Sequence, residues 1–372
     1  MAIIMTGVHI QLYRSGSPEH LADLKRFRAQ GLPVPYFYRH RPLSNTRIIR
    51  KWVRALGPDK QQLICAFIVE LAPSRAMPGM RIGKVERLGR SLHQQGISKI
   101  GDILAETAKK IHCLLRLDVQ VFDEDETRRR ALMAMITKAG GKPARQPRRY
   151  SHTLMLDIAK SDDELMQVLS ARTRRSIRKS TKCPMIEIRP ILDMRYTSRI
   201  LELHAETFAR TAAKPHFLDV EGMFSDSKNS SDALLLGAFR LRKHQPHELV
   251  AFAWATMQGD HAVYERAASV RIQGANSISP GAALMWHLLR WARDQGADWF
   301  DFGGITPLDV EKDHPLMGIS TFKRGFSNIE REVATEFCFE PLPFLTAAAR
   351  LERKVARKLK LGQAWHLLQQ LA

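Results

Sequence analysis

Cysteine is scarce in this sequence, and acidic residues are outnumbered. The four cysteines lie far apart with no CxxC spacing, so neither a disulfide framework nor a zinc site is indicated. Against 58 Lys and Arg there are only 38 Asp and Glu, which leaves a formal net charge of +20. Such an excess favours a polyanionic partner over a basic surface that is merely solvated. The partner classes are a nucleic acid, an anionic membrane and a phosphorylated substrate.

Long hydrophobic runs are absent as well. The longest, Leu63–Val69, is far shorter than the roughly 20 residues that a membrane-spanning helix needs. The apolar run Ala2–Met5 has no basic flank and no cleavage pattern after it, so it does not resemble a secretory signal. We therefore expect a cytoplasmic protein, located at the inner face of the membrane if the anionic partner is a lipid.

Several common chemical motifs are missing. The sequence contains no GxGxxG, HExxH or GxSxG pattern, and Gly140-Gly141-Lys142 lacks the upstream glycine of a phosphate loop. His204 and Glu206 share an expected helix but point to different faces, so we expect no metal site. We also expect no resident cofactor.

The order of the expected elements indicates two domains of one kind. Both halves run from antiparallel strands through a helix into a strand that carries an aspartate, Asp118 in the first half and Asp301 in the second. This order is that of the GNAT acyltransferase fold. We therefore expect an α/β (α+β) protein with two GNAT-like domains, each a mixed, largely antiparallel sheet flanked by helices.

A basic, proline-containing connector that ends at Tyr150 marks the expected domain boundary. The expected divisions are an N-terminal domain with an irregular first segment at 1–150, a second domain at 151–344 and a basic amphipathic tail helix at 345–372. Basic residues interleave with Leu, Val and Trp in that tail, which suits peripheral contact with an anionic membrane or a grip on tRNA.

A run of positive charge stands out in the second half. The expected helix from Ser161 to Lys182 carries six basic residues in its last eleven positions and no acid among them. Like charges on one face destabilise a helix, so this pattern favours a bound anion, with a solvated face as the alternative. The residues expected to bind the phosphates of tRNA are Arg172, Arg174, Arg175, Arg178, Lys179 and Lys182.

A second pattern suggests a ligand site. The expected strand Trp299–Gly303 ends in Asp-Phe-Gly-Gly, which frees backbone at the edge of a sheet where ligands of α/β proteins bind. After a loop, Gly318–Phe326 contains an expected turn that presents an exposed lysine between aromatic residues. The substrate-binding residues expected on the strands are Asp301, Gly303, Gly304 and Tyr264.

A CoA-binding pattern is only half present. The pyrophosphate signature of ordinary GNAT enzymes, Q/RxxGxG/A, has its counterpart in Arg271-Ile-Gln-Gly274-Ala-Asn276. Asn276 stands where a small residue would let the backbone approach a phosphate. This difference weakens an acetyl-CoA interpretation without removing it.

Three of these stretches together resemble the Fem family. They are Arg174–Arg178, the helix–strand unit Gly281–Gly304 and Gly318–Phe326, and the likeness extends over residues 150–340 and more weakly over 101–120. Members of that family are aminoacyl-tRNA-dependent transferases that add amino acids to peptidoglycan precursors, and they are built from two GNAT-like domains. This sequence lacks the long charged heptad segment that forms a helical arm in some of them.

The resemblance implies roles for individual residues. Lys323 would lie in the reaction channel with Phe322 before it, Asp118 would line the acceptor site, and Arg210 would contact the acceptor. We expect Lys323 to stabilise charge near the ester or terminal phosphate. Asp118 would position the acceptor amine or assist its deprotonation.

The implied activity is transfer of an amino acid from aminoacyl-tRNA to an amine. The acceptor would be a peptidoglycan precursor peptide or a related amine, phosphorylated or lipid-linked. The alternatives are a CoA-dependent N-acyltransferase acting on a polysaccharide or natural product, and a non-enzymatic basic protein that binds RNA or a membrane.

Overall fold

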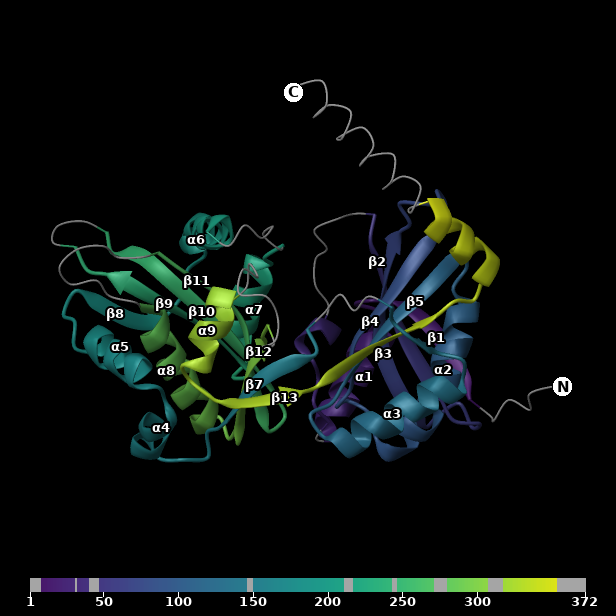
Figure 1. Cartoon of the computed structure of the whole chain (residues 1–372), viewed down its shortest axis with the longest axis horizontal. Helices are drawn as coiled ribbons and strands as arrows, with labels where there is room; N and C mark the ends of the chain where they lie inside the picture. The colour runs from purple at the N-terminus through teal and green to yellow at the C-terminus, as the bar shows by residue number, and fades with distance from the viewer. Residues whose placement is uncertain are drawn as a thin grey trace, which may run out of the picture. The chain divides into compact units, whose positions relative to one another are not determined.

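The computed structural model of this 372-residue chain describes residues 8–30, 32–39, 47–145, 150–210, 217–242, 246–270, 280–306 and 317–352. The chain divides into two compact units (Figure 1). Unit 1 comprises residues 1–32, 45–149 and 334–372, and unit 2 comprises residues 33–44 and 150–333. Residues 334–344, which we expected in the second domain, thus belong to unit 1.

Unit 1 is built on a mixed seven-stranded sheet. In spatial order its strands are β1 (His9–Arg14), β2 (Ile49–Leu56), β3 (Leu63–Pro73), β4 (Arg81–Gly89), β5 (Leu114–Phe122), β14 (Ala334–Phe339) and β6 (Lys142–Pro143). Only β4 and β5 are parallel, as the connection through an intervening helix requires. The last strand of the chain, β14, returns to pair antiparallel with β5, which explains why residues 334–344 leave the second domain.

Three helices of unit 1 are α1 (Pro18–Ala29), α2 (Gln94–Lys110) and α3 (Glu126–Lys138). Helix α1 begins at a serine cap, Ser17, followed by a proline at the first helical position, and Asp125 caps α3 in the same way. Helix α2 connects β4 to β5, and eight of its side chains are buried along one face. A further helical stretch, residues 343–352, follows β14.

Unit 2 contains a second mixed seven-stranded sheet. Its strands in spatial order are β13 (Ile329–Glu332), β7 (His152–Asp157), β12 (Trp299–Gly304), β11 (His261–Ser269), β10 (Glu248–Gln258), β9 (Ala233–Arg240) and β8 (Ile186–Pro190). Here β11 and β12 form the parallel pair, joined through α8 (Pro280–Asp294). The two units therefore share one scheme: antiparallel strands, a helix, and a strand parallel to the last of them.

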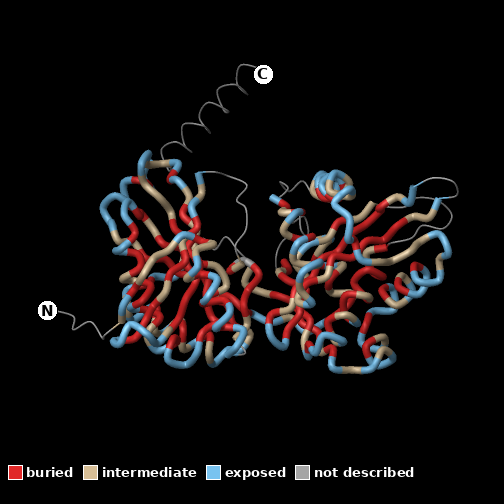
Figure 2. The backbone as a smooth tube through the Cα atoms, turned by 180° about the vertical axis from the view of Figure 1, so that it is seen from behind, coloured by how far each residue is buried: buried red, intermediate tan, exposed pale blue. Residues whose placement is uncertain are grey.

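Two hydrophobic clusters occupy the sheet of unit 2. One joins the sheet to α8, α4 (Asp162–Val168) and α5 (Ala171–Thr181), and the other joins it to α6 (Thr197–Ala209) and α7 (Val220–Asn229). Figure 2 shows the resulting contrast between buried strands and exposed helix surfaces. The alternating pattern of the strands is lost in β10, because nearly every one of its residues is buried.

The helices of unit 2 differ from our expectation in three places. The helix expected from Ser161 to Lys182 is two helices, because Leu169 is extended and Ser170 caps a new start. Helix α7 was missed. The turn expected at Gly318–Phe326 is instead a short helix, α9 (Met317–Arg324). Within the described residues no helix is both long and apolar enough to cross a membrane.

The crossing of α2 and α3 leads to a prediction about stability. A Cβ at Gly101 would lie 2.1 Å from the carbonyl oxygen of Met135 in α3. Gly101→Ala should therefore lower the free energy of unfolding by about 1–3 kcal/mol or more, since helix backbone has to move. Urea denaturation measures this change. Asp102→Ala, at the exposed next position, should change stability by less than about 0.5 kcal/mol; equal values for both variants would contradict the close crossing.

Candidate functional site

The parallel pairing of β11 and β12 is short. It joins His261 to Trp299, Ala262 to Phe300 and Val263 to Asp301, and from Tyr264 onward β11 has no register partner on β12. In unit 1 the equivalent pair β4 and β5 remains paired, with two register shifts, up to Gly89 and Phe122, the last residues of both strands. The described sheets therefore differ at the C-terminal ends of their parallel strands, and ligands of α/β sheets bind at such ends.

The end of β12 is held in a specific conformation. Gly303 has φ +72°, a left-handed value that favours glycine. Its N–H donates to Oδ1 of the buried Asp301 at 2.7 Å, and the Thr153 hydroxyl donates to the same oxygen. Asp301 thus fixes the backbone turn, and the sequence-based expectation of substrate binding by its carboxylate stays a prediction.

Lys323 contacts this strand end directly. Its Nζ donates to the carbonyl oxygen of Gly304 at 2.8 Å and lies 5.7 Å from the ring centroid of Tyr264. The residue is only 7 % exposed and lies on α9, so the expected exposed lysine in a turn is wrong. The physical reason is that α9 packs Lys323 and Ser320 inward, with the Ser320 hydroxyl accepting from the N–H of Thr306.

Aromatic groups line the surroundings of Lys323. Phe322 packs on Phe326 in an edge-to-face pair and lies within 4 Å of a Cβ built on Gly281, in the first turn of α8. Burial raises the pKa of Tyr264 well above its usual range, so its phenol stays neutral at physiological pH. Tyr264, Phe322, Gly303 and Gly304 are thus gathered around Lys323.

The basic residues of α5 form one face. Thr173, Ile177 and Ser180 are buried toward the sheet, which turns the opposite side outward. That exposed side carries Arg172, Arg175, Arg178, Lys179 and, at the C-cap, Lys182. Among the described residues none of these five has an ion pair with a carboxylate, unlike most arginines elsewhere in unit 2.

Arg174 behaves differently from its neighbours. Its guanidinium donates to the carbonyl oxygens of Gln167 and Leu169, at 3.2 and 2.6 Å, and so satisfies the C-terminal end of α4. The guanidinium of Arg174, one of the six residues expected to bind phosphate, is therefore used within the protein. The helix break at Ser170, which the periodicity did not reveal, is the reason.

Helix α5 and Lys323 meet at one turn. The N–H of Ser170 donates to the carbonyl of Gly325 at 2.9 Å, and a Cβ on Gly325 would lie 2.3 Å from Oγ1 of Thr173. Gly325 lies two residues after Lys323, and a larger residue at this position would collide with the first turn of α5. This contact joins the buried side of α5, opposite its cationic face, to the segment that follows Lys323.

The remaining predicted residues lie elsewhere. Asp118 is on β5 of unit 1 and forms a two-pronged ion pair with Arg116, at 2.7 and 3.0 Å. Arg210 caps the end of α6 and donates to the carbonyl of Ser269 at 2.6 Å. The half-formed CoA pattern at 271–276 and most of the tail, 353–372, lie outside the described residues.

Sequence reasoning missed several residues that shape the site. A Cβ on Gly304 would lie 2.3 Å from the ring of Tyr150, so this tyrosine packs directly on the strand end. Arg324 donates to the carbonyl of Thr306 and pairs with Glu330. The only available signal was the pair of adjacent glycines, because glycine is needed where another chain segment approaches backbone closely.

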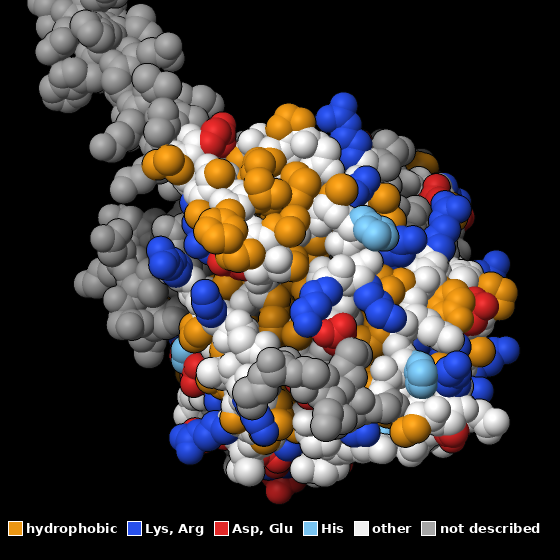
Figure 3. All heavy atoms as spheres, turned by 90° about the vertical axis from the view of Figure 1, so that its right-hand side faces the viewer, with side chains coloured by type: hydrophobic (Ala, Val, Ile, Leu, Met, Phe, Trp, Pro, Cys, Tyr) orange, Lys and Arg blue, Asp and Glu red, His pale blue; other side chains and the backbone are white. Residues whose placement is uncertain are grey.

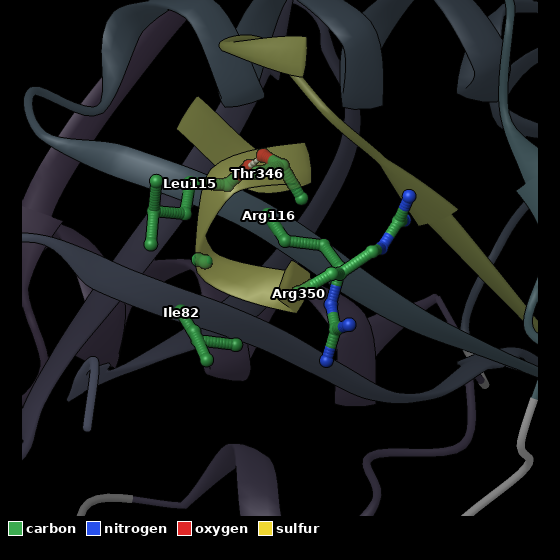
Figure 4. A pocket seen from close by; sticks show the side chains of 6 residues that line it. Ile82, Leu115, Arg116, Thr346 and Arg350 are labelled. Atoms are coloured by element: carbon green, nitrogen blue, oxygen red, sulfur yellow. Dashed lines mark hydrogen bonds between the residues drawn. The ribbon is translucent and has the colours of Figure 1, made fainter. Parts of the chain in front are cut away.

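In the described part of the chain no group of three or more His, Cys, Asp or Glu side chains could hold a metal ion. Figure 4 shows a cavity of about 20 Å³ in unit 1, lined by Ile82, Leu115, Arg116, Thr346, Ala349 and Arg350. It has room for about one water molecule and not for an acyl donor.

Comparison with known proteins supports the fold. A family model described as Acetyltransferase (GNAT) domain matches residues 168–324. The crystal structure of FemX superposes with a TM-score of 0.64 at 16% sequence identity, covering 79% of this chain and 89% of that one. The structure of L-PGS from Bacillus licheniformis gives a TM-score of 0.52 at 12% identity, covering 93% and 99%. No curated protein sequence matches the chain.

The chain therefore has a tandem GNAT fold, with one GNAT-like sheet in each unit. The expected fold class is confirmed, and the resemblance to the Fem family is confirmed as a resemblance in fold. The matched GNAT segment contains α5, Tyr264, Gly303, Gly304 and Lys323.

The conformation of Gly303 leads to a prediction with a matched control. A Cβ at Gly303 would lie 3.7 Å from Nζ of Lys323, whereas Gly296, with φ +86°, has no atom within 4 Å of that position. Gly303→Ala and Gly296→Ala should each cost about 1 kcal/mol of stability through backbone strain. Only Gly303→Ala should lower transfer activity strongly. Thermal denaturation and a transfer assay on both variants measure this, and equal activities would remove Gly303 from the site.

Proposed function

We propose that this protein is an acyltransferase that moves an amino acid from aminoacyl-tRNA to an amine acceptor, forming an amide bond. The observation that carries the proposal is the buried ammonium of Lys323, held against the Gly304 carbonyl where the β11–β12 ladder ends. Helix α5 packs on Gly325, two residues after Lys323, through its buried side, and its opposite side is the exposed cationic face. The acceptor that we propose is the amine of a peptidoglycan precursor peptide or a related amine.

The reaction needs little covalent chemistry from the protein. The acceptor nitrogen attacks the ester carbonyl, a C–N bond forms, the C–O bond to the ribose breaks, and the ribose oxygen takes up a proton. The amine must first lose its own proton, and its pKa is roughly 8 for an α-amino group or about 10.4 for a lysyl one. Alignment of the reactants and stabilisation of the oxyanion are then the main tasks of the enzyme.

The side chain of Lys323 is suited to stabilising the oxyanion. An ammonium has three N–H donors, and the bond to Gly304 orients the group toward the strand end. A cation in a buried position interacts more strongly with a developing oxyanion than one in water. Lys323 would therefore stabilise negative charge on the ester carbonyl or on the leaving ribose oxygen.

Asp118 has a different role in the proposed reaction. Both of its carboxylate oxygens bond to the Arg116 guanidinium, which fixes the orientation of the carboxylate. Asp118 would therefore position the acceptor through unit 1, and water or the substrate itself would remove the proton from the amine. The role of Arg210 as an acceptor contact stays a prediction.

The cationic face of α5 supports a donor with many phosphates. Its five basic residues without carboxylate partners extend along three turns of helix, whereas CoA offers its phosphates within one small site. Such a surface matches the regularly spaced phosphates of RNA. A CoA-dependent N-acyltransferase is the second candidate, and the match of residues 168–324 to the acetyltransferase domain favours it.

The role of Lys323 can be tested with a substitution that respects its burial. Lys323→Met keeps the length of the side chain and removes the charge, and it should lower kcat/KM about 100-fold or more because a preorganised donor is lost. Lys323→Arg should also be poor, because a planar guanidinium does not replace a compact ammonium. Gly318→Ala, on the same helix with no atom within 4 Å of the new Cβ, is the control. Activity of Lys323→Met within tenfold of wild type would exclude the lysine from the chemistry.

The cationic face of α5 can be tested by its salt dependence. Replacing Arg175, Arg178 and Lys179 with Gln should raise KM for the donor more than KM for the acceptor. The log–log slope of donor binding against salt should become shallower by about one for each lost phosphate contact. The triple variant Lys25→Gln, Arg26→Gln, Arg28→Gln on α1 removes the same charge elsewhere and should leave the slope unchanged. Identical slopes for both variants would make the α5 face merely solvated.

The decisive experiment distinguishes the two donors. Incubated with charged tRNA and a peptidoglycan-type peptide amine, the protein should move labelled amino acid into a product that resists RNase. RNase added before the reaction should abolish transfer. Transfer from acetyl-CoA that is unaffected by RNase, with none from tRNA charged with any amino acid, would overturn the aminoacyl proposal in favour of the CoA-dependent one.

A further inference from the structure

The helical stretch 343–352 of unit 1 packs through a narrow face. Only Thr346 and Ala349 of these residues are buried. The Thr346 hydroxyl donates to the carbonyl of Leu115 at 2.7 Å, where the register between β4 and β5 shifts by one residue (Figure 4). The threonine thus satisfies a carbonyl at an irregularity of the sheet, and this contact fixes which side of the helix points outward.

The outward side is apolar. Phe344, Ala347, Ala348 and Leu351 are exposed and follow the i, i+3, i+4, i+7 spacing of one helix face. At about 100° per residue this stripe lies opposite to Thr346 and Ala349. Phe344 is 89 % exposed and Leu351 is 64 % exposed, and Leu342 and Leu345 are exposed beside them. Figure 3, which looks onto unit 1, shows hydrophobic side chains gathered on this surface with Lys and Arg at its border.

A helix of a folded domain normally turns its apolar stripe toward the core. Here the apolar stripe points away from the sheet, so it has a cost in water unless something covers it. The charged residues that precede and follow the stripe in the sequence indicate what covers it. Glu340 neutralises Arg350 by an ion pair, and the eight residues that follow Glu352 contain five cations: Arg353, Lys354, Arg357, Lys358 and Lys360.

We propose that the stripe Phe344–Ala347–Ala348–Leu351 docks on the surface of an anionic lipid bilayer. Apolar side chains enter the boundary between headgroups and acyl chains, and adjacent Lys and Arg are attracted to anionic lipids. A second copy of this chain is disfavoured as the occupant, because each copy carries a net charge of +20. RNA would match the cations but offers no aliphatic surface for Leu and Ala to contact. This docking surface is independent of the proposed activity.

The experiment is co-flotation of the full chain with vesicles. Wild-type protein should float with vesicles of equal parts phosphatidylglycerol and phosphatidylcholine, and not with phosphatidylcholine alone. Phe344→Gln with Leu351→Gln should lower the bound fraction about tenfold, because two large exposed side chains no longer enter the bilayer. The matched control is Leu192→Gln with Phe217→Gln, which removes two exposed hydrophobic side chains, 66 % and 54 % exposed, from unit 2. That control should float as the wild type does.

Each other outcome overturns the proposal. Flotation of the Phe344/Leu351 variant at the wild-type level would show that the cations alone bind lipid. Absence of wild-type flotation would mean that the stripe has another occupant, either a second copy, revealed by concentration-dependent dimerisation that the variant loses, or residues 353–372 of the same chain. Loss of tRNA binding in the variant with unchanged flotation would assign the surface to RNA. Thermal denaturation and transfer to a soluble acceptor should be unchanged in the variant, so failure of the docking surface is distinguishable from failure of the proposed function.

Discussion

The early end of the parallel ladder between β11 and β12 is the constraint on which the candidate site depends. Because pairing with β11 stops at Val263 and Asp301, Gly303 and Gly304 have no register partner on β11, although Gly304 still pairs with Thr153 of β7. Lys323 donates to the Gly304 carbonyl, and the left-handed turn at Gly303, supported by Asp301, sets the direction of that carbonyl. The geometry of the strand backbone thus positions the lysine, through the hydrogen bond to the Gly304 carbonyl.

The two units share one topology but differ at the C-terminal ends of their parallel strands. In unit 1, β4 and β5 pair to their last residues with two register shifts, and the returning strand β14 covers the other edge of β5. In unit 2, β7 takes the corresponding place beside β12. A closed parallel pair offers no free strand backbone to a ligand, so duplication of the fold supplied two sheets but only one strand end of this kind among the described residues. This asymmetry is the reason why we propose unit 2 as the location of the transfer chemistry.

The positive charge of the chain is unevenly compensated. Arginines on the surface of unit 2 commonly pair with nearby carboxylates, as Arg199 does with Glu202 and Glu206. The exposed face of α5 has no such partners in the described structure, and its cations remain available to an external anion. In unit 1 the helix 343–352 presents an apolar stripe, and five further cations follow it in the sequence. The exposed face of α5 is therefore cationic, whereas the exposed stripe of helix 343–352 is apolar.

Much of the fold was predictable from the sequence, because strands and long helices are local patterns. The strand bounds 114–122 and 261–269 and the capping box at Ser161 follow from periodicity and from side chains that bond within a turn. The ligand site expected from the glycines after Asp301 stays a prediction, whereas the helix expected from the basic run is present as α5. Each of these features depends on residues that are neighbours in the chain.

Tertiary structure decided the rest. The return of β14 to β5, the burial of Lys323 on α9 and the use of Arg174 at the end of α4 all depend on partners far apart in sequence or on a helix break that leaves no periodic signal. The pattern around Lys323 is compatible with an exposed turn, and only packing against β12 buries it. A sequence determines which surfaces each element can present, whereas the packing of non-local partners determines which of those surfaces remains available for function.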